Sequence, residues 1–94
     1  MDQQLSNTAF PVERVRAQFP AFSEGANAPI YLDNPAGTLV PQQVIDAVGH
    51  ALATASHNLG GPFAGSKRAD AIWLKAHKAM ADMLGAASER EIVI

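Results

Sequence analysis

The chain contains no cysteine, which excludes a disulfide framework and any metal site built on thiolates. It also lacks an excess of basic charge. Seven Lys and Arg stand against nine Asp and Glu, and the basic residues are dispersed along the chain. A nucleic-acid-binding protein needs a basic patch to neutralise phosphates, so we expect no nucleic-acid partner. No apolar run is long enough for a signal sequence or a membrane span, so we expect a cytoplasmic protein with no membrane partner.

Large side chains that could fill a core are scarce. The 94 residues include one Trp, one Tyr and four Phe, and alanine supplies much of the 48% apolar content. Burial gives about 25 cal/mol per Å² of apolar area, so a short, alanine-rich chain gains little against the entropy lost on folding. Composition alone therefore leaves two interpretations open, which are a small helical domain and a part of a larger body.

The first half of the chain predicts two helices. Residues 1–10 are polar and show no periodicity, so we expect a flexible N-terminus. Pro11 suits the first turn of a short helix, which ends at Phe19 because the residue before Pro20 is disfavoured in the helical region. Pro41 begins a second helix, whose apolar face consists of Val44, Ile45, Val48, Leu52 and Ala55.

A third, longer helix follows the glycine-containing loop of residues 57–65. Ser66 is placed to cap its N-terminus, and Gly85 is placed for a left-handed C-cap. The spacing predicts a buried stripe formed by Ala69, Ile72, Trp73, Ala76, Met80, Met83 and Leu84. We expect the lysines of this helix, Lys67, Lys75 and Lys78, to lie on its solvated face.

Two short apolar runs predict β-strands, near residues 30–32 and 91–94. The order helix, short strand, helix, loop, helix, strand is typical of the opening of an α/β domain. Ser88 and Glu91 match the spacing of a helix capping box, but a strand-like run follows them, so we interpret the match as coincidence.

Motifs for metal or nucleotide chemistry are weak. His50, His57 and His77 are too far apart for a local metal site, and we expect each at the surface or at a helix end. Residues 60–67 resemble a phosphate-binding loop, but Ser66 and Lys67 stand in the reverse of the required order. The sequence therefore predicts no metal site and no catalytic residue within the chain.

Two loops remain unusual, at residues 33–38 and 58–63. The first carries small and polar side chains directly after a predicted strand, and the second joins two helices through Gly60 and Gly61. Glycine lets a backbone approach a ligand closely, although ordinary turn chemistry explains the same residues.

These loops belong to a longer resemblance. VRAQFPAF at residues 15–22, IYLDNPAG at 30–37, VPQQVIDA at 40–47, NLGGPFAGS at 58–66 and EIVI at 91–94 resemble, in this order, the N-terminal part of cysteine desulfurase-like, class V aminotransferase enzymes. The resemblance covers about residues 12–94. It implies an α/β parent of the pyridoxal-phosphate-dependent fold type I, of which this chain is a mainly α-helical piece.

The resemblance also implies a site and a chemistry. Such enzymes hold pyridoxal 5′-phosphate through a lysine and use its ring as an electron sink. The resemblance places the residues that hold the cofactor beyond Ile94, so we expect residues 11–94 to be an N-terminal segment that is inactive alone. Its partners would be a small amino-acid substrate, the remainder of the enzyme domain and a second subunit of a homodimer. The residues expected to line the substrate site are Asn34, Ala36, Gly37, Asn58 and Gly61.

Three functions remain open at this point. The first is C–S cleavage or a related reaction at the α-carbon of an amino acid. The second is another reaction of the same family, carried out by an aminotransferase, an epimerase or a lyase. The third is a non-enzymatic helical module that binds a partner helix through Trp73, Met80 and Met83.

Overall fold

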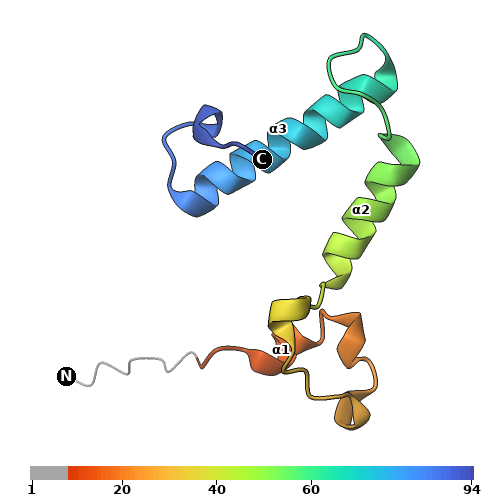
Figure 1. Ribbon diagram of the computed structural model, residues 1–94, viewed down its shortest axis with the longest axis vertical. Helices are drawn as coiled ribbons and strands as arrows, with labels where there is room; N and C mark the ends of the chain where they lie inside the picture. The colour runs from red at the N-terminus through yellow and green to blue at the C-terminus, as the bar shows by residue number, and fades with distance from the viewer. Residues whose placement is uncertain (1–8) are drawn as a thin grey trace, which may run out of the picture. The chain divides into compact units, whose positions relative to one another are not determined.

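The computed structural model describes residues 9–94. The predicted flexible N-terminus, residues 1–10, lies outside the described residues except for Ala9 and Phe10. The chain divides into two compact units, one ending at Ala47 and the other beginning at Val48. Its α-helices are α1 (Val12–Arg16), α2 (Gln42–Thr54) and α3 (Ala64–Leu84) (Figure 1). The boundary between the units falls inside α2, and each unit is described by itself.

The first unit begins with α1 and continues through short 3-10 turns. The helix starts directly after Pro11, as predicted, but ends at Arg16, earlier than expected. Phe19 is extended (φ −103°, ψ 113°), which confirms that the residue before Pro20 leaves the helical region. The 3-10 turns are η1 (Pro20–Phe22), η2 (Gly25–Asn27) and η3 (Asn34–Ala36).

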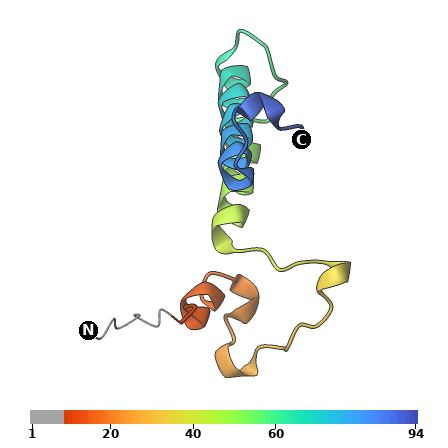
Figure 2. The same cartoon turned by 90° about the vertical axis from the view of Figure 1, so that its left-hand side faces the viewer.

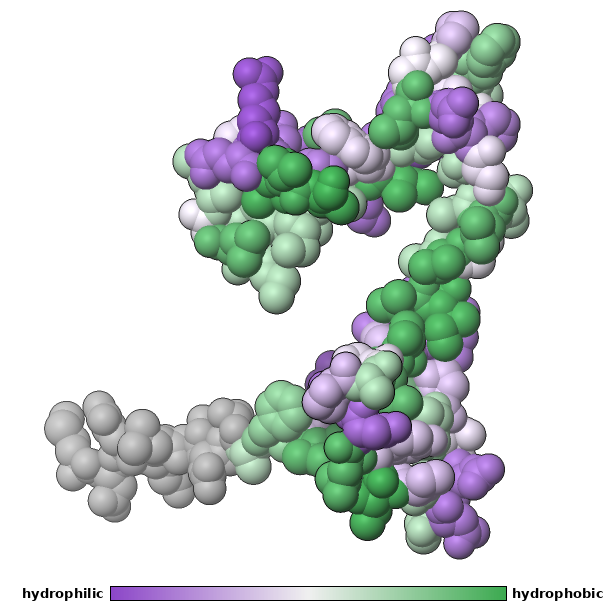
Figure 3. Space-filling model, in the orientation of Figure 1, coloured by the Kyte–Doolittle hydropathy of each residue, from purple (hydrophilic) through white to green (hydrophobic). Residues whose placement is uncertain are grey.

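Helix α2 follows Pro41, which confirms the predicted start. Its first amide, that of Gln42, donates a hydrogen bond to the carbonyl of Gln18 at 2.8 Å, which connects α2 to the segment after α1. The predicted apolar face lies open: Val44, Ile45, Val48 and Leu52 are all exposed. Apolar surface is therefore displayed along the described chain instead of being gathered into a core (Figure 3).

Helix α3 begins earlier than predicted. Phe63 occupies the N-cap position and makes no side-chain capping bond, while Ser66 lies inside the first turn and is only 5% exposed. The prediction that Ser66 caps the helix is therefore wrong. The opposite end is as predicted, since Gly85 adopts the left-handed conformation (φ 68°, ψ 27°). The amides of Gly85 and Ala86 bond back to the carbonyls of Asp82 and Ala81, as in a Schellman motif.

The predicted buried stripe of α3 is wrong apart from Ala69. Trp73 is 50% exposed and Met83 is 79% exposed, and no large side chain in residues 9–94 is fully buried. Buried positions are instead held by small residues and by His77, and they are Gly65, Ser66, Ala69, His77 and Ala81. The 3-10 turn η4 (Glu89–Glu91) lies back against α3 (Figure 2), so this helix has a short neighbour but no facing helix within its unit.

Neither predicted strand forms. Residues 30–32 and 91–94 contain no strand, and Leu32 and Val93 are about as exposed as side chains can be, at 89% and 93%. A strand exists only when a second strand completes its hydrogen-bond ladder, and the part of the chain described offers no such partner. Glu91 belongs to η4, whose N-cap is Ser88; the Ser88 hydroxyl accepts a hydrogen bond from the Arg90 amide at 3.2 Å. Ser88 therefore caps this turn, whereas the reciprocal bond of a capping box, from the Ser88 amide to the Glu91 side chain, is not among the hydrogen bonds of the described residues.

Candidate functional site

The first predicted site loop forms the turn η3. The Ala36 amide donates to the Asp33 carbonyl at 2.9 Å, and the Gly37 amide donates to the Asn34 carbonyl at 3.1 Å. Pro35 lies within the turn, where its fixed φ is favourable. Gly37 has an extended backbone (φ 168°) that any residue can adopt, and no atom lies close to the position of an added Cβ.

Asn34 and Gly37 line a common cavity of about 380 Å³. Its other lining residues are Phe19, Phe22, Tyr31, Asp33, Thr38 and Leu39. Ala36 lies in the same turn but is exposed and does not line the cavity. The structure therefore gathers two of the predicted residues, together with the Asp33 carboxylate, around an aromatic floor.

The floor of this cavity is an aromatic cluster that the sequence did not single out. The Phe22 ring packs edge-on against Phe19, with centroids 6.2 Å apart, and against Tyr31, with centroids 5.8 Å apart. Edge-to-face contacts at such distances are favourable, because the positive ring edge meets the negative ring face. Phe22 thus connects η1 to the segment that leads into the Asn34 turn.

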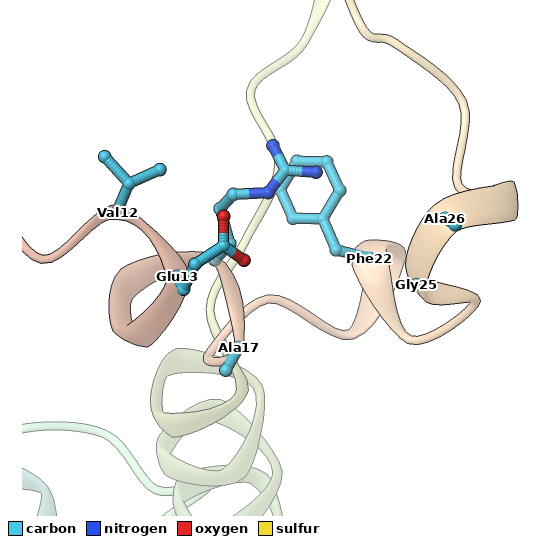
Figure 4. A pocket seen from close by; sticks show the side chains of 7 residues that line it. Val12, Glu13, Ala17, Phe22, Gly25 and Ala26 are labelled. Carbon is cyan, nitrogen blue, oxygen red and sulfur yellow. The ribbon is translucent and has the colours of Figure 1, made fainter.

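A second cavity, of about 640 Å³, lies beside the same Phe22 ring. The Arg16 guanidinium stands over the ring at 4.0 Å from its centroid, within the range of a cation–π contact. Figure 4 shows the Phe22 ring at this cavity, with the Glu13 side chain nearby. The remaining lining residues are small or apolar: Val12, Ala17, Gly25 and Ala26.

The second predicted site loop, residues 58–63, belongs to the other unit, within the connection of residues 55–63 between α2 and α3, and it is held by the first turns of α3. The Asp70 carboxylate accepts a hydrogen bond from the Gly60 amide at 3.0 Å. The Arg68 Nε donates to the Thr54 carbonyl, the last residue of α2, at 2.7 Å. Gly60 itself has φ +81°, a left-handed conformation that favours glycine.

Two close approaches complete this attachment. A Cβ added to Gly61 would stand 2.5 Å from the Ser66 Oγ, and a Cβ added to Gly65 would overlap the His57 ring. The loop therefore lies against α3 so closely that a side chain added at Gly61 or Gly65 would have to displace a neighbouring side chain. Asn58 is exposed between the His57 and Gly60 contacts, and Gly61 is half-buried. The glycines of this loop were a signal in the sequence, but the roles of His57, Arg68 and Asp70 were not predicted.

The three histidines differ from one another in exposure. His50 and His57 are exposed, which confirms the prediction for these two. His77 is 4% exposed, so the prediction that it lies at the surface or at a helix end is wrong. Its Nδ1 lies 2.8 Å from the Trp73 carbonyl, and its ring lies over the Trp73 ring with centroids 3.7 Å apart. This spacing of four residues places both side chains on one helix face, a signal present in the sequence.

The described residues do not by themselves fit pyridoxal phosphate. That cofactor needs a lysine for its aldehyde carbon, and neither cavity is lined by one. Lys67, Lys75 and Lys78 are exposed on α3, as predicted. Across residues 9–94, no group of His, Asp and Glu is arranged to hold a metal ion. In the same residues, no helix has the length and apolar character that a membrane span requires.

Comparisons with known proteins identify the chain's relatives. Residues 30–94 match the family model described as aminotransferase class-V. A curated protein of Vibrio cholerae named "Probable cysteine desulfurase" is 33% identical over 85 residues, which cover 87% of this chain. The aligned region is 21% of that relative, so the chain spans about a fifth of its length. No solved structure matches. Since the family match covers most of the chain and both site loops, the protein belongs to the class V aminotransferase family.

Proposed function

We propose that this chain is the N-terminal part of a pyridoxal-phosphate-dependent enzyme that acts on an amino acid, by C–S cleavage or a related reaction at the α-carbon. The observation that carries the proposal is the class V match over residues 30–94, supported by the likeness to a protein named as a cysteine desulfurase. Both predicted site loops, residues 33–38 and 58–63, lie inside the matched range. Membership of this family implies the fold type I architecture for the complete protein.

The exposed apolar surface supports the same proposal. Leu52 of α2, Met83 of α3 and Val93 at the C-terminus are exposed, and the described residues gather no core around them. Covering such large apolar side chains with another surface would remove their apolar area from water, which is favourable. In the proposed enzyme the remainder of the same domain and a second subunit cover these side chains, and the isolated chain is inactive.

The residues expected at the substrate have distinct parts in this proposal. The Asn34 side chain, at the 380 Å³ cavity, offers an amide that donates to a substrate carboxylate. Gly37 keeps the wall of that cavity free of a side chain, and Ala36 supports the turn. Asn58 and Gly61 contribute from the second loop. Pyridoxal phosphate acts as an electron sink in enzymes of this family.

The test uses the product of the complete reading frame that contains this chain. We expect the purified protein to show the visible absorption of bound pyridoxal phosphate and to release sulfide from cysteine. We expect Asn34→Ala to lower kcat/KM by about tenfold to a hundredfold, because a hydrogen bond to a charged group contributes about 1.5–3 kcal/mol. Asn27→Ala is the matched control, since Asn27 is exposed in η2 and lines neither cavity.

The outcomes separate the candidate functions. Visible absorption with turnover of another amino acid, but no sulfide release, would favour an aminotransferase, an epimerase or a lyase of the same family. A colourless protein without turnover would refute the enzyme proposal. It would favour the helical interaction module, which the exposure of Trp73 and Met83 supports.

A further inference from the structure

The geometry of residues 54–70 points to a role that the family match does not assign. We infer that Asp70 is a positioning residue that fixes the backbone of the Asn58–Gly61 loop, so that the loop is presented to the substrate in one conformation. The inference rests on the proposed function, because it assumes that this loop contributes to a substrate site.

The first step is the hydrogen bond itself. The Asp70 Oδ1 accepts the Gly60 amide proton at 3.0 Å, across ten positions of sequence. A carboxylate that accepts from a backbone amide forms a charge-assisted bond, which is stronger than a neutral one. Asp70 lies in the second turn of α3, a helix of 21 residues, so the acceptor is carried by a regular element.

The second step is the conformation that the bond holds. Gly60 has φ +81°, where other residues are strained. Gly60 lies two positions after Asn58 and directly before Gly61, so a rotation of its backbone redirects both predicted site residues. The bond to Asp70 fixes the amide plane that joins Gly60 to Leu59.

The third step is that other contacts hold the two ends of the loop, whereas the hydrogen bond to Asp70 holds its middle. Arg68 bonds to the Thr54 carbonyl before the loop, and the close approach of Gly61 to Ser66 follows Gly60. The His57 amide donates to the Ala55 carbonyl at 2.8 Å, and across residues 58–61 the described hydrogen bond is the one from Gly60 to Asp70. Loss of the Asp70 acceptor therefore loosens the loop without detaching it from α3.

The test compares Asp70→Ala with Asp70→Asn in the complete protein. Asp70→Ala removes the acceptor, and we expect a rise in KM of about fivefold with a smaller change in kcat, which corresponds to about 1 kcal/mol. Asp70→Asn keeps an oxygen acceptor, and we expect it to restore most of the lost affinity. Asp82→Ala is the matched control, because Asp82 is an exposed carboxylate of the same helix.

A second variant disturbs the same hydrogen bond at its donor residue, Gly60. Gly60→Ala strains the left-handed backbone, and we expect it to raise KM as Asp70→Ala does, with the double variant no worse than either alone. Gly85→Ala is its matched control, since Gly85 also has positive φ (+68°) but lies at the C-terminal end of α3 and lines neither cavity. Unchanged KM in both variants of an active protein, or a failure of Asp70→Asn to recover affinity, would overturn the inference.

A direct readout keeps this inference separate from the proposed function. We expect the Gly60 amide to exchange its proton about fivefold faster in Asp70→Ala than in the original chain, and near the original rate in Asp70→Asn. Faster exchange in a protein that turns over no amino acid would keep the structural role of Asp70 and refute the enzyme proposal. Equal exchange in all three proteins would refute the positioning role itself.

Discussion

The contact between His57 and Gly65 gives a prediction whose sign depends on a single neighbour. An ideal Cβ on Gly65 overlaps the Cε1, Nδ1 and Nε2 atoms of the His57 ring. Gly65→Ala must therefore displace the ring, and such overpacking costs about 1–3 kcal/mol. The same substitution favours the helical backbone by up to about 1 kcal/mol. We expect a net loss of about 1 kcal/mol in the local stability of the first turn of α3.

Removing the His57 ring reverses the expected sign of the stability change that Gly65→Ala causes. In a His57→Ala background the added methyl group meets no imidazole, so only the gain in helix propensity remains. We expect Gly65→Ala to stabilise the first turn there by up to about 1 kcal/mol. The double variant should therefore be more stable in this turn than His57→Ala alone. His50→Ala is the matched control background, because His50 is an exposed histidine of α2.

Hydrogen exchange of the Lys67 amide measures this effect. That amide donates to the Phe63 carbonyl at 3.0 Å and reports opening of the first turn. About 1 kcal/mol corresponds to about a fivefold change in exchange rate. We expect Gly65→Ala to speed exchange in the original and His50→Ala backgrounds and to slow it in the His57→Ala background. A change of the same sign in all three backgrounds would refute the steric argument.

Two further predictions concern the end of α3 and the aromatic cluster. Gly85→Ala places a side chain at φ +68°. We expect the C-terminal end of α3 to lose about 1 kcal/mol of local stability, measured as faster hydrogen exchange of the Ala86 amide. Gly49→Ala, in mid-helix with no atom close by, should instead increase the helicity measured by circular dichroism, and a matching loss there would contradict the reasoning. Arg16→Ala removes the cation above Phe22, and we expect the NMR resonances of that ring to shift. We also expect the first unit to lose about 0.5–1 kcal/mol of stability. Arg14→Ala, on the same helix, should leave those resonances in place, and equal shifts in both variants would show that the cation–π contact has no effect.

The helices of this chain could be predicted because their signals are local. Pro41 and the periodic residues after it place the start of α2, and Gly85 supplies the left-handed cap that ends α3. The strands predicted near residues 30–32 and 91–94 do not form in the described structure, because a strand needs a partner strand to satisfy its backbone groups. The buried stripe predicted on α3 is wrong for a similar reason, because its burial also depends on a partner surface. Trp73 and Met83 carry helical periodicity, but periodicity says nothing of which surface covers them.

The candidate site was predicted to a smaller extent. The polar turn at Asn34 and the glycines at 60 and 61 could be recognised, since both are unusual in composition and belong to the family resemblance. The groups that hold these loops in place could not be recognised. Each contact joins two residues that are several positions apart, and no local sequence pattern relates them to one another. Asp70 reads in the sequence as an ordinary acidic residue near a helix start, and its bond to Gly60 follows only from the path of the loop.

The attachment of the 55–63 loop to α3 has a consequence for motion. His57, Gly60 and Gly61 all rest on residues of the first two turns of that helix, so loop and helix end form one mechanical unit. A displacement of the loop therefore has to break these contacts or move the beginning of α3 with it. Since η4 lies against the same helix, a shift of α3 as a whole would change the contacts of that turn as well.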